Sequence, residues 1–301
     1  MSSVHASIQG RWERPQVYDF AGTLRFLRLG SHDPSLIQCP GELFTAVHTA
    51  AGPAVLHLAD GPELSAQAWG PGAEMAVKMA PDWLGLNDSP VTLGHLHPAV
   101  RELERRFPGL HLARPGRVFD GLLRVIPQQL VAWTDATVFW RRLVEQFGTE
   151  LPGPVRLMLP PSPDAVRAHS AAALQSTGML PKMARCMIDC ARRARRLDAL
   201  ADLSLDEFVR LVQVLPGVGP WTAGQLAGFH LAHSDAVIVG DYGMPHSIAY
   251  ALTGRERSTD SEMLELLEPF RPHRFRVIRL IMHAGIVPPR RGPRGDLQTR
   301  R

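Results

Sequence analysis

The chain has 301 residues, of which 45% are hydrophobic and 21% charged, a composition that suits two globular domains with a sizeable core. Its apolar runs are short and interrupted by Arg, Pro or His, which excludes a membrane-spanning helix and a membrane partner. The formal net charge is +4, and the first residues lack the apolar centre of a signal peptide, so we expect a cytoplasmic protein.

The first 112 residues mix strand and turn signals. The segment GELFTAVHTAAGPAVLHLAD (41–60) holds two β-leaning runs separated by a hairpin-like break, and LSAQAWG (64–70) alternates with a period of two. The following segment has a helical pattern that starts near Ala73 and is expected to stop at Pro81. We therefore predict an N-terminal α+β domain with an antiparallel sheet over residues 1–112, which ends in the linker HLARPGR (111–117).

From Val118 onward the apolar spacing is helical, so we predict an all-α domain over residues 113–287. Its first two apolar stripes comprise Phe119, Leu122, Leu123 and Ile126, then Leu130, Val131, Val138, Phe139, Leu143 and Phe147, with Gly148 as a stop. A Pro-rich connection, LPGPVRLMLPPSP (151–163), ends at a helix start. Two further starts are capping boxes, Ser204 with Glu207 and Thr259 with Glu262. The basic tail 288–301 is predicted to be disordered.

Cysteine, histidine and arginine give weaker signals. Cys186 and Cys190 lie four apart in a helical pattern and are interpreted as packed small residues, since no metal-ligand spacing surrounds them. The histidines are scattered, so no catalytic metal is expected. The chain has 31 Arg and two Lys, and its clusters RRARR (192–196), RPHRFRVIR (271–279) and the tail fit either a nucleic-acid surface or solvated helix faces.

The most informative stretch is LPGVGPW (215–221), which joins a capped helix to a second helix starting near Pro220. Gly217 and Gly219 permit positive φ and a close backbone approach. A glycine turn at a helix start also presents backbone N–H groups that bind phosphate. The pattern predicts a helix-hairpin-helix that grips a DNA backbone without reading bases, although a bare GxG is equally typical of a simple helix–helix turn.

The segment LPGVGPWTA, followed by Asp235 and Asp241, resembles the signature of the helix-hairpin-helix superfamily of base-excision DNA glycosylases. It is most similar to the bacterial 3-methyladenine DNA glycosylase II type. The likeness extends over most of the chain, to VIPQQLVAWTDA (125–136), RPHRFRVIRLIMHAG (271–285), TLRFLRLGSHDP (23–34) and AQAWGPGAEMAV (66–77). The resemblance implies base-excision repair of alkylation damage on duplex DNA by a nucleoid-associated monomer that flips out the damaged base.

The resemblance also assigns roles to individual residues. Asp241 would be the catalytic carboxylate that stabilises an oxocarbenium-like sugar; without the family, it would be interpreted as a loop aspartate that caps the helix near Pro245. Base-pocket candidates are Trp221, Tyr242, Gln225, Trp133 and Met282. DNA-binding candidates are Leu130, Gln129, Pro216, Gly217, Val218, Gly219 and Thr222. No cofactor is required, but the resemblance suggests a structural monovalent cation held by hairpin carbonyls.

Several alternatives stay open. Trp221 occupies the position where bifunctional members carry a lysine, which favours a monofunctional enzyme, and it suits either the pocket or the core. Leu130 would fill the gap left by the flipped base, although a lone Leu in an apolar stripe is typical of core. An aromatic pocket would select cationic alkylated purines by cation–π attraction. Pro127, Gln225 and Met282 depart from the family pattern, which leaves the substrate open.

Two other functions fit the same sequence. One is a non-catalytic helix-hairpin-helix protein that senses DNA damage. The other is a glycosylase of the same fold for deaminated or oxidised bases.

Overall fold

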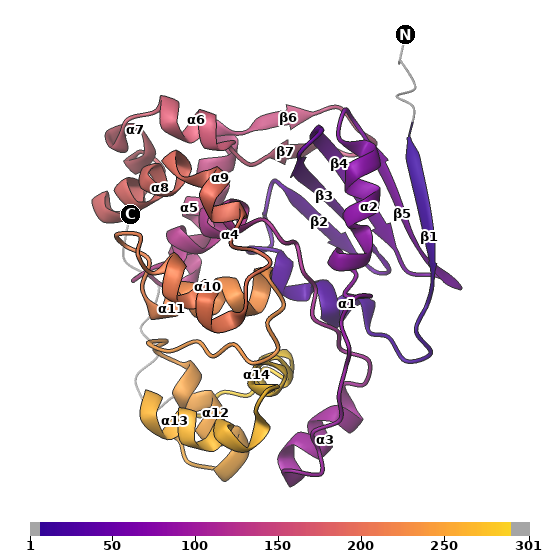
Figure 1. Cartoon of the computed structure of the whole chain (residues 1–301), viewed down its shortest axis with the longest axis vertical. Helices are drawn as coiled ribbons and strands as arrows, with labels where there is room; N and C mark the ends of the chain where they lie inside the picture. Colours follow the sequence, from indigo (N-terminus) through magenta and orange to yellow (C-terminus); the bar gives the residue numbers. More distant parts are fainter. Residues whose placement is uncertain (1–6, 290–301) are drawn as a thin grey trace, which may run out of the picture.

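The computed structural model describes residues 7–289, and it places an antiparallel sheet beside a larger body of helices (Figure 1). The five strands lie in the order β1-β5-β4-β3-β2, and every neighbouring pair is antiparallel. They are β1 (Ile8–Glu13), β2 (Leu36–Cys39), β3 (Glu42–Thr49), β4 (Gly52–Ala59) and β5 (Glu63–Trp69). The predicted antiparallel sheet is confirmed, including the β3–β4 hairpin and the alternating strand β5.

Helix α2 (Ala73–Trp83) packs on the sheet, and its alanines allow a close approach to β4 and β5. On β5 the residues Leu64, Ala66 and Ala68 are buried while those between them are partly exposed, as period-two alternation requires. The predicted helix start at Ala73 is confirmed, but the predicted stop at Pro81 is wrong by two residues. A proline in the last turn lacks only one N–H, and the helix continues to Trp83.

The remaining elements are mostly helical, and most of them share one large hydrophobic core. Phe20, Leu24 and Leu27 belong instead to the core between the sheet and α2. In chain order, the first of these elements are α1 (Phe20–Leu24), the 3-10 turn Arg25–Leu27, α3 (Pro98–Arg106), α4 (Val118–Val125), the 3-10 turn Ile126–Gln128 and α5 (Trp133–Phe147). Then follow α6 (Pro163–Ala168), α7 (Ala171–Gln175), α8 (Pro181–Arg192), α9 (Ala194–Asp198), α10 (Leu205–Val212) and α11 (Pro220–Gln225). Last come the π-helical turn Leu226–His230, α12 (Met244–Thr253), α13 (Asp260–Leu267), the 3-10 turn Glu268–Phe270 and α14 (Arg274–His283).

Three predictions about the second half need correction. It is not all helical, because β6 (Thr149–Leu151) and β7 (Leu157–Leu159) form a hairpin inside the Pro-rich connection. Leu157 and Leu159 pack against the sheet, which the local sequence could not reveal. The second apolar stripe is confirmed only in part. Helix α5 begins only at Trp133, and of the predicted residues Leu143 is buried while Val131, Phe139 and Phe147 pack partly buried against the core. Ala136, Trp140 and Val144 are buried although the stripe did not include them. Finally, α3 precedes the predicted boundary yet contributes Val100 and Leu103 to the helical core.

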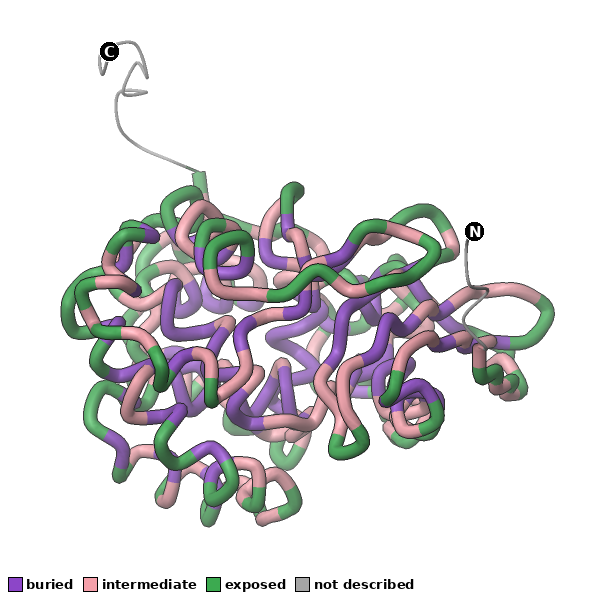
Figure 2. The backbone as a smooth tube through the Cα atoms, turned by 90° about the horizontal axis from the view of Figure 1, so that it is seen from above, coloured by how far each residue is buried: buried purple, intermediate pink, exposed green. Residues whose placement is uncertain are grey.

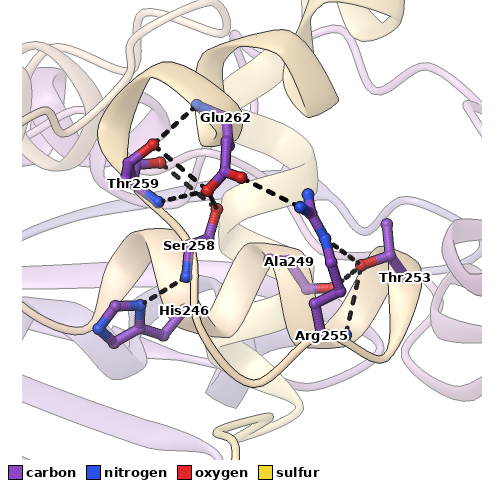
Figure 3. Close-up of polar contacts among 7 residues, drawn as sticks. All are labelled: His246, Ala249, Thr253, Arg255, Ser258, Thr259 and Glu262. Carbon is purple, nitrogen blue, oxygen red and sulfur yellow. Dashed lines mark hydrogen bonds and ion pairs between the residues drawn. The ribbon is translucent and has the colours of Figure 1, made fainter.

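Both predicted capping boxes are present. Ser204 caps α10 and Thr259 caps α13, and in each case the glutamate three residues later binds back to the cap. Around α13, Glu262 also accepts a hydrogen bond from Ser258 and pairs with Arg255 at 3.1 Å (Figure 3). The backbone N–H of Ser258 donates to His246 Nδ1 of α12. This network therefore joins α13 to α12, the helix that carries the candidate active site at its start.

Figure 2 shows buried backbone running through the middle of the molecule and exposed segments around its rim. Over residues 7–289, no helix has the length and apolarity needed to cross a bilayer. The predicted basic tail lies outside the described residues apart from its first two positions, Pro288 and Pro289.

Candidate active site

A cleft of about 870 Å³ opens between the N-terminal part and the helices. Most of the residues proposed from the sequence line it together. These are Asp241, Trp221, Tyr242, Gln225, Trp133, Met282, Leu130, Gln129, Gly217, Gly219 and Thr222. The two exceptions belong to the hairpin: Pro216 is exposed outside the cleft, and the side chain of Val218 is buried in the core. Val218 can therefore offer a ligand only its backbone.

The hairpin turn is built as its glycines suggest, with one difference. Gly217 has a φ of +87°, and a Cβ there would lie 3.0 Å from the side chain of Cys186 on α8. The turn closes through Val218 N–H, which donates to the Leu215 carbonyl at 3.0 Å. Gly219 instead has a φ of −96°, so the positive φ that a glycine permits is not used there, and a Cβ would meet nothing within 4 Å. Gly219 thus leaves open space in front of the first turn of α11.

The carboxylate of Asp241 is held by three donors from two directions. Its Oδ1 accepts hydrogen bonds from the backbone N–H groups of Gly243 and Met244, both at 2.8 Å, where α12 begins. Its Oδ2 accepts one from the indole N–H of Trp221 at 2.9 Å. Asp241 therefore does cap α12, and the same contacts fix an acidic oxygen at the cleft. The two interpretations of this residue are compatible.

A second carboxylate steadies the chain beside Asp241. Asp260, the first residue of α13, accepts a hydrogen bond from the N–H of Gly240 at 3.0 Å. The loop that carries Asp241 is thus bound at one end to α13 and at the other to α12.

Trp221 is partly buried and packs against the core while its N–H reaches Asp241, so it serves both pocket and core. Tyr242 and Trp133 are exposed large aromatics at the edge of the cleft. Their positions suit a surface that is covered by a bound partner.

Leu130 projects from the rim rather than joining the core. It is 73% exposed and has a φ of +59°, a conformation that is uncommon for a branched side chain. The neighbouring Gln129 amide donates to the Gly217 carbonyl at 2.9 Å and to Thr222 Oγ1 at 3.0 Å. The rim segment is therefore tied to the hairpin. Interpretation of Leu130 as a core residue is wrong.

The inner end of the cleft holds residues that the sequence did not single out: Phe26, Arg124, Phe229 and His230. Phe229 and His230 lie on the π-helical turn after α11, a geometry often found at functional sites. Burial, with the charge of Arg124 as a smaller cause, lowers the pKa of His230 to about 3, so its imidazole is neutral. The helical spacing of apolar residues does not reveal these positions. Phe26 alone lies within a segment, 23–34, that carries the resemblance to DNA glycosylases.

Arg124 belongs to a buried polar network beneath the cleft. It pairs with Asp33 at 3.1 Å and stacks over Trp140 at 4.6 Å, and the Trp140 indole donates to Asp33 at 2.8 Å. Asp33 also accepts hydrogen bonds from Leu29 N–H, Ser35 N–H and the Ser35 hydroxyl. This network connects the N-terminal part to α4 and α5.

One predicted basic cluster is not a surface patch. Arg274, Arg276 and Arg279 of α14 are all buried, since each has a partner inside the protein. Arg274 pairs with Asp235 at 2.7 Å and Arg276 with Asp88, whereas Arg279 packs on aromatic rings. The four arginines of 192–196 are exposed. Among residues 7–289, no three His, Cys, Asp or Glu side chains are grouped as a metal site.

No protein-family model matches the chain. A curated relative, DNA-3-methyladenine glycosylase 2 of Escherichia coli (strain K12), is 28% identical over 146 residues. The match covers 48% of this chain and 52% of the relative, so it spans about half the length of that protein.

Solved structures match over more of the chain. A 3-methyladenine DNA glycosylase from Archaeoglobus fulgidus has a TM-score of 0.76 at 18% identity, covering 91% of this chain and 97% of the other. A Clostridium acetobutylicum 8-oxoguanine glycosylase/lyase bound to duplex DNA gives 0.68 at 13%, covering 89% and 91%. Schizosaccharomyces pombe 3-methyladenine DNA glycosylase, in complex with abasic DNA, gives 0.53 at 16%, covering 63% and 93%. The chain therefore has the fold of DNA glycosylases, which confirms the predicted resemblance.

Proposed function

We propose that this chain is a monofunctional DNA glycosylase of base-excision repair, which hydrolyses the N-glycosidic bond of a damaged purine flipped out of duplex DNA. The observation that carries the proposal is the held carboxylate of Asp241, which faces a cleft large enough for a nucleobase and lies beside the hairpin. The fold shared with DNA glycosylases supports it.

The chemistry follows from that carboxylate. The bond between C1′ and the base nitrogen breaks, and its electron pair leaves with the base. The sugar then carries oxocarbenium character, which the negative charge of Asp241 stabilises in a partly dry cleft. Water adds its oxygen to C1′, and one of its protons balances the departing base. The products are a free base and an abasic site.

Binding to DNA is assigned to the hairpin and the rim. The backbone N–H groups at the start of α11 would bind phosphate, with the open space in front of Gly219 allowing close approach. Leu130 would enter the gap that the flipped base leaves. The carbonyls of Leu215 and Gly217 each accept one hydrogen bond and keep a second lone pair. These carbonyls would hold the monovalent cation, which would bridge the hairpin to a DNA phosphate. The protein would act on DNA as a monomer.

The substrates we propose first are alkylated purines, because the relative and two of the solved structures carry 3-methyladenine glycosylase names. A second candidate is a lyase acting on other bases. It is favoured by one observation: Lys182, which carries an amine, is one of the residues that line the cleft. An amine can displace the base by attacking C1′ and then cleave the strand through a Schiff base.

The test is base release from duplexes that each carry one lesion: 3-methyladenine, 7-methylguanine, 1,N6-ethenoadenine, hypoxanthine or 8-oxoguanine. Asp241→Asn should lower release at least about 100-fold, the scale for loss of one transition-state group. The control is Asp135→Asn, an exposed acid of α5 outside the cleft, which should match wild type. Tight duplex binding with no release by wild type would sink the proposal and favour a damage-sensing protein.

A further inference from the structure

The inner wall of the cleft already carries a cation. Phe26 and Phe229 line it with ring centroids 5.6 Å apart. The guanidinium carbon of Arg279 lies 4.2 Å from the centroid of Phe26 and 5.6 Å from that of Phe229. Arg279 is 4% exposed and lines a separate cavity rather than the cleft, so its charge lies within the wall beside the two rings. Arg25, which is exposed, adds a second positive charge 5.7 Å from the Phe26 centroid.

The charge on Arg279 is not neutralised by an ion pair. Within residues 7–289, its side chain has one hydrogen bond, to the Gly22 carbonyl at 3.3 Å, and its Nη1 has no partner. The nearby Asp19 is 3.6 Å from His283 instead. Burial, and then the charge of Arg25, lower the pKa of Arg279 to about 9, and the charge of Asp19 opposes this shift. Arg279 is therefore protonated at neutral pH.

Other groups of the cleft add positive charge. Arg124 and Lys182 line it, and Asp241 is the acidic residue among the described lining residues. Arg124 is balanced by Asp33, but its charge still reaches His230. His230 is 9% exposed and stays neutral in this environment.

The consequence for catalysis has two parts. A cation close to an aromatic ring weakens the attraction of that ring for a second cation. A neutral base, in contrast, gains negative charge as it leaves with the bonding electron pair, and a nearby positive charge stabilises that change. The wall thus opposes a cationic base and helps a neutral one to leave.

We propose that this cleft selects damaged purines that are neutral in DNA over purines made cationic by alkylation at a ring nitrogen. The inference rests on the proposed glycosylase function and reverses the order of substrates given with it: neutral bases such as 1,N6-ethenoadenine, hypoxanthine or 8-oxoguanine come before the cationic 3-methyladenine and 7-methylguanine. It replaces the cation–π selection that the sequence suggested.

The first experiment measures binding rather than release. The Asp241→Asn protein is offered two differently labelled duplexes in one sample, carrying 1-methyladenine, a cation, or 1,N6-ethenoadenine, which is neutral. Both lesions modify N1 and abolish normal pairing, so the cost of flipping is similar. We expect roughly five- to tenfold tighter binding of the neutral lesion. Equal binding, or preference for the cation, overturns the inference.

The second experiment changes the charge beside the rings. Arg279→Met should move the binding ratio toward the cationic lesion by roughly fivefold, whereas Arg279→Lys, which keeps the charge, should retain the wild-type ratio. The ratio is taken within one sample, so a reduced folded fraction cancels. An unchanged binding ratio in the Arg279→Met variant refutes the role of Arg279. If that variant does not fold, the binding ratio measured in the first experiment, in which Arg279 is intact, still decides the inference.

The two proposals fail differently. If wild type releases no base from any duplex, the glycosylase function is lost while the binding ratio still reports selectivity. If wild type releases bases but binding favours the cation, the function stands and the inference falls.

Discussion

Asp33 offers a sharp test of what holds the cleft together. Its carboxylate is fully buried and accepts five hydrogen bonds, three at Oδ1 and two at Oδ2. In Asp33→Asn, an amide nitrogen must replace one oxygen. The less costly choice places this amide nitrogen at the Oδ2 position, which accepts two hydrogen bonds rather than three. There it faces two other donors, the N–H groups of Leu29 and Arg124. Arg124 is also left as a buried cation without its counter-charge.

Breaking one partner of a buried ion pair costs about 3–5 kcal/mol of unfolding free energy. We therefore expect Asp33→Asn to lose that amount in urea denaturation followed by tryptophan fluorescence. The matched control is Asp60→Asn, which breaks the Asp60–Arg14 pair at 2.7 Å, with side chains 24% and 29% exposed. Partial exposure limits that loss to about 1 kcal/mol. A loss below about 1 kcal/mol for Asp33→Asn, or equal losses for both variants, would refute the reasoning.

Four further predictions concern the hairpin and the cleft. Gly217→Ala should destabilise the protein by about 1–2 kcal/mol, because it combines a positive φ with a Cβ 3.0 Å from Cys186. Gly219→Ala should leave stability within about 0.5 kcal/mol but weaken duplex binding; equal unfolding midpoints for the two variants would contradict this. The lowered pKa of His230 means that the unfolded chain gains a proton below about pH 6.5 that the folded protein refuses until about pH 3. The free energy of unfolding therefore decreases as pH falls through this window. Between pH 7 and pH 5 this decrease should be about 2 kcal/mol smaller in His230→Gln than in wild type, as measured by urea titrations at each pH. Borohydride should trap no enzyme–DNA adduct; trapping that disappears in Lys182→Gln would instead establish the lyase.

Much of the local structure was predictable because its causes lie within a few residues. The capping boxes at Ser204 and Thr259 join groups three residues apart, and the β3–β4 hairpin follows from its turn. The hairpin turn 215–219 and the position of Asp241 were likewise visible, since the motif has a fixed internal spacing. Even so, local rules misplaced the end of α2 and the start of α5, where packing decided the outcome.

The sequence by itself thus determined the two kinds of structure, the glycine turn proposed to bind DNA and the residue proposed for catalysis. Only the tertiary structure decided how the cleft is charged. Arg279 reaches Gly22 across 257 positions and lies beside Phe26, and three arginines that looked like a surface patch are buried. Such contacts depend on how α14, the π-helical turn and the N-terminal part pack together. No spacing along the chain encodes them, because each helix alone would leave those side chains in water.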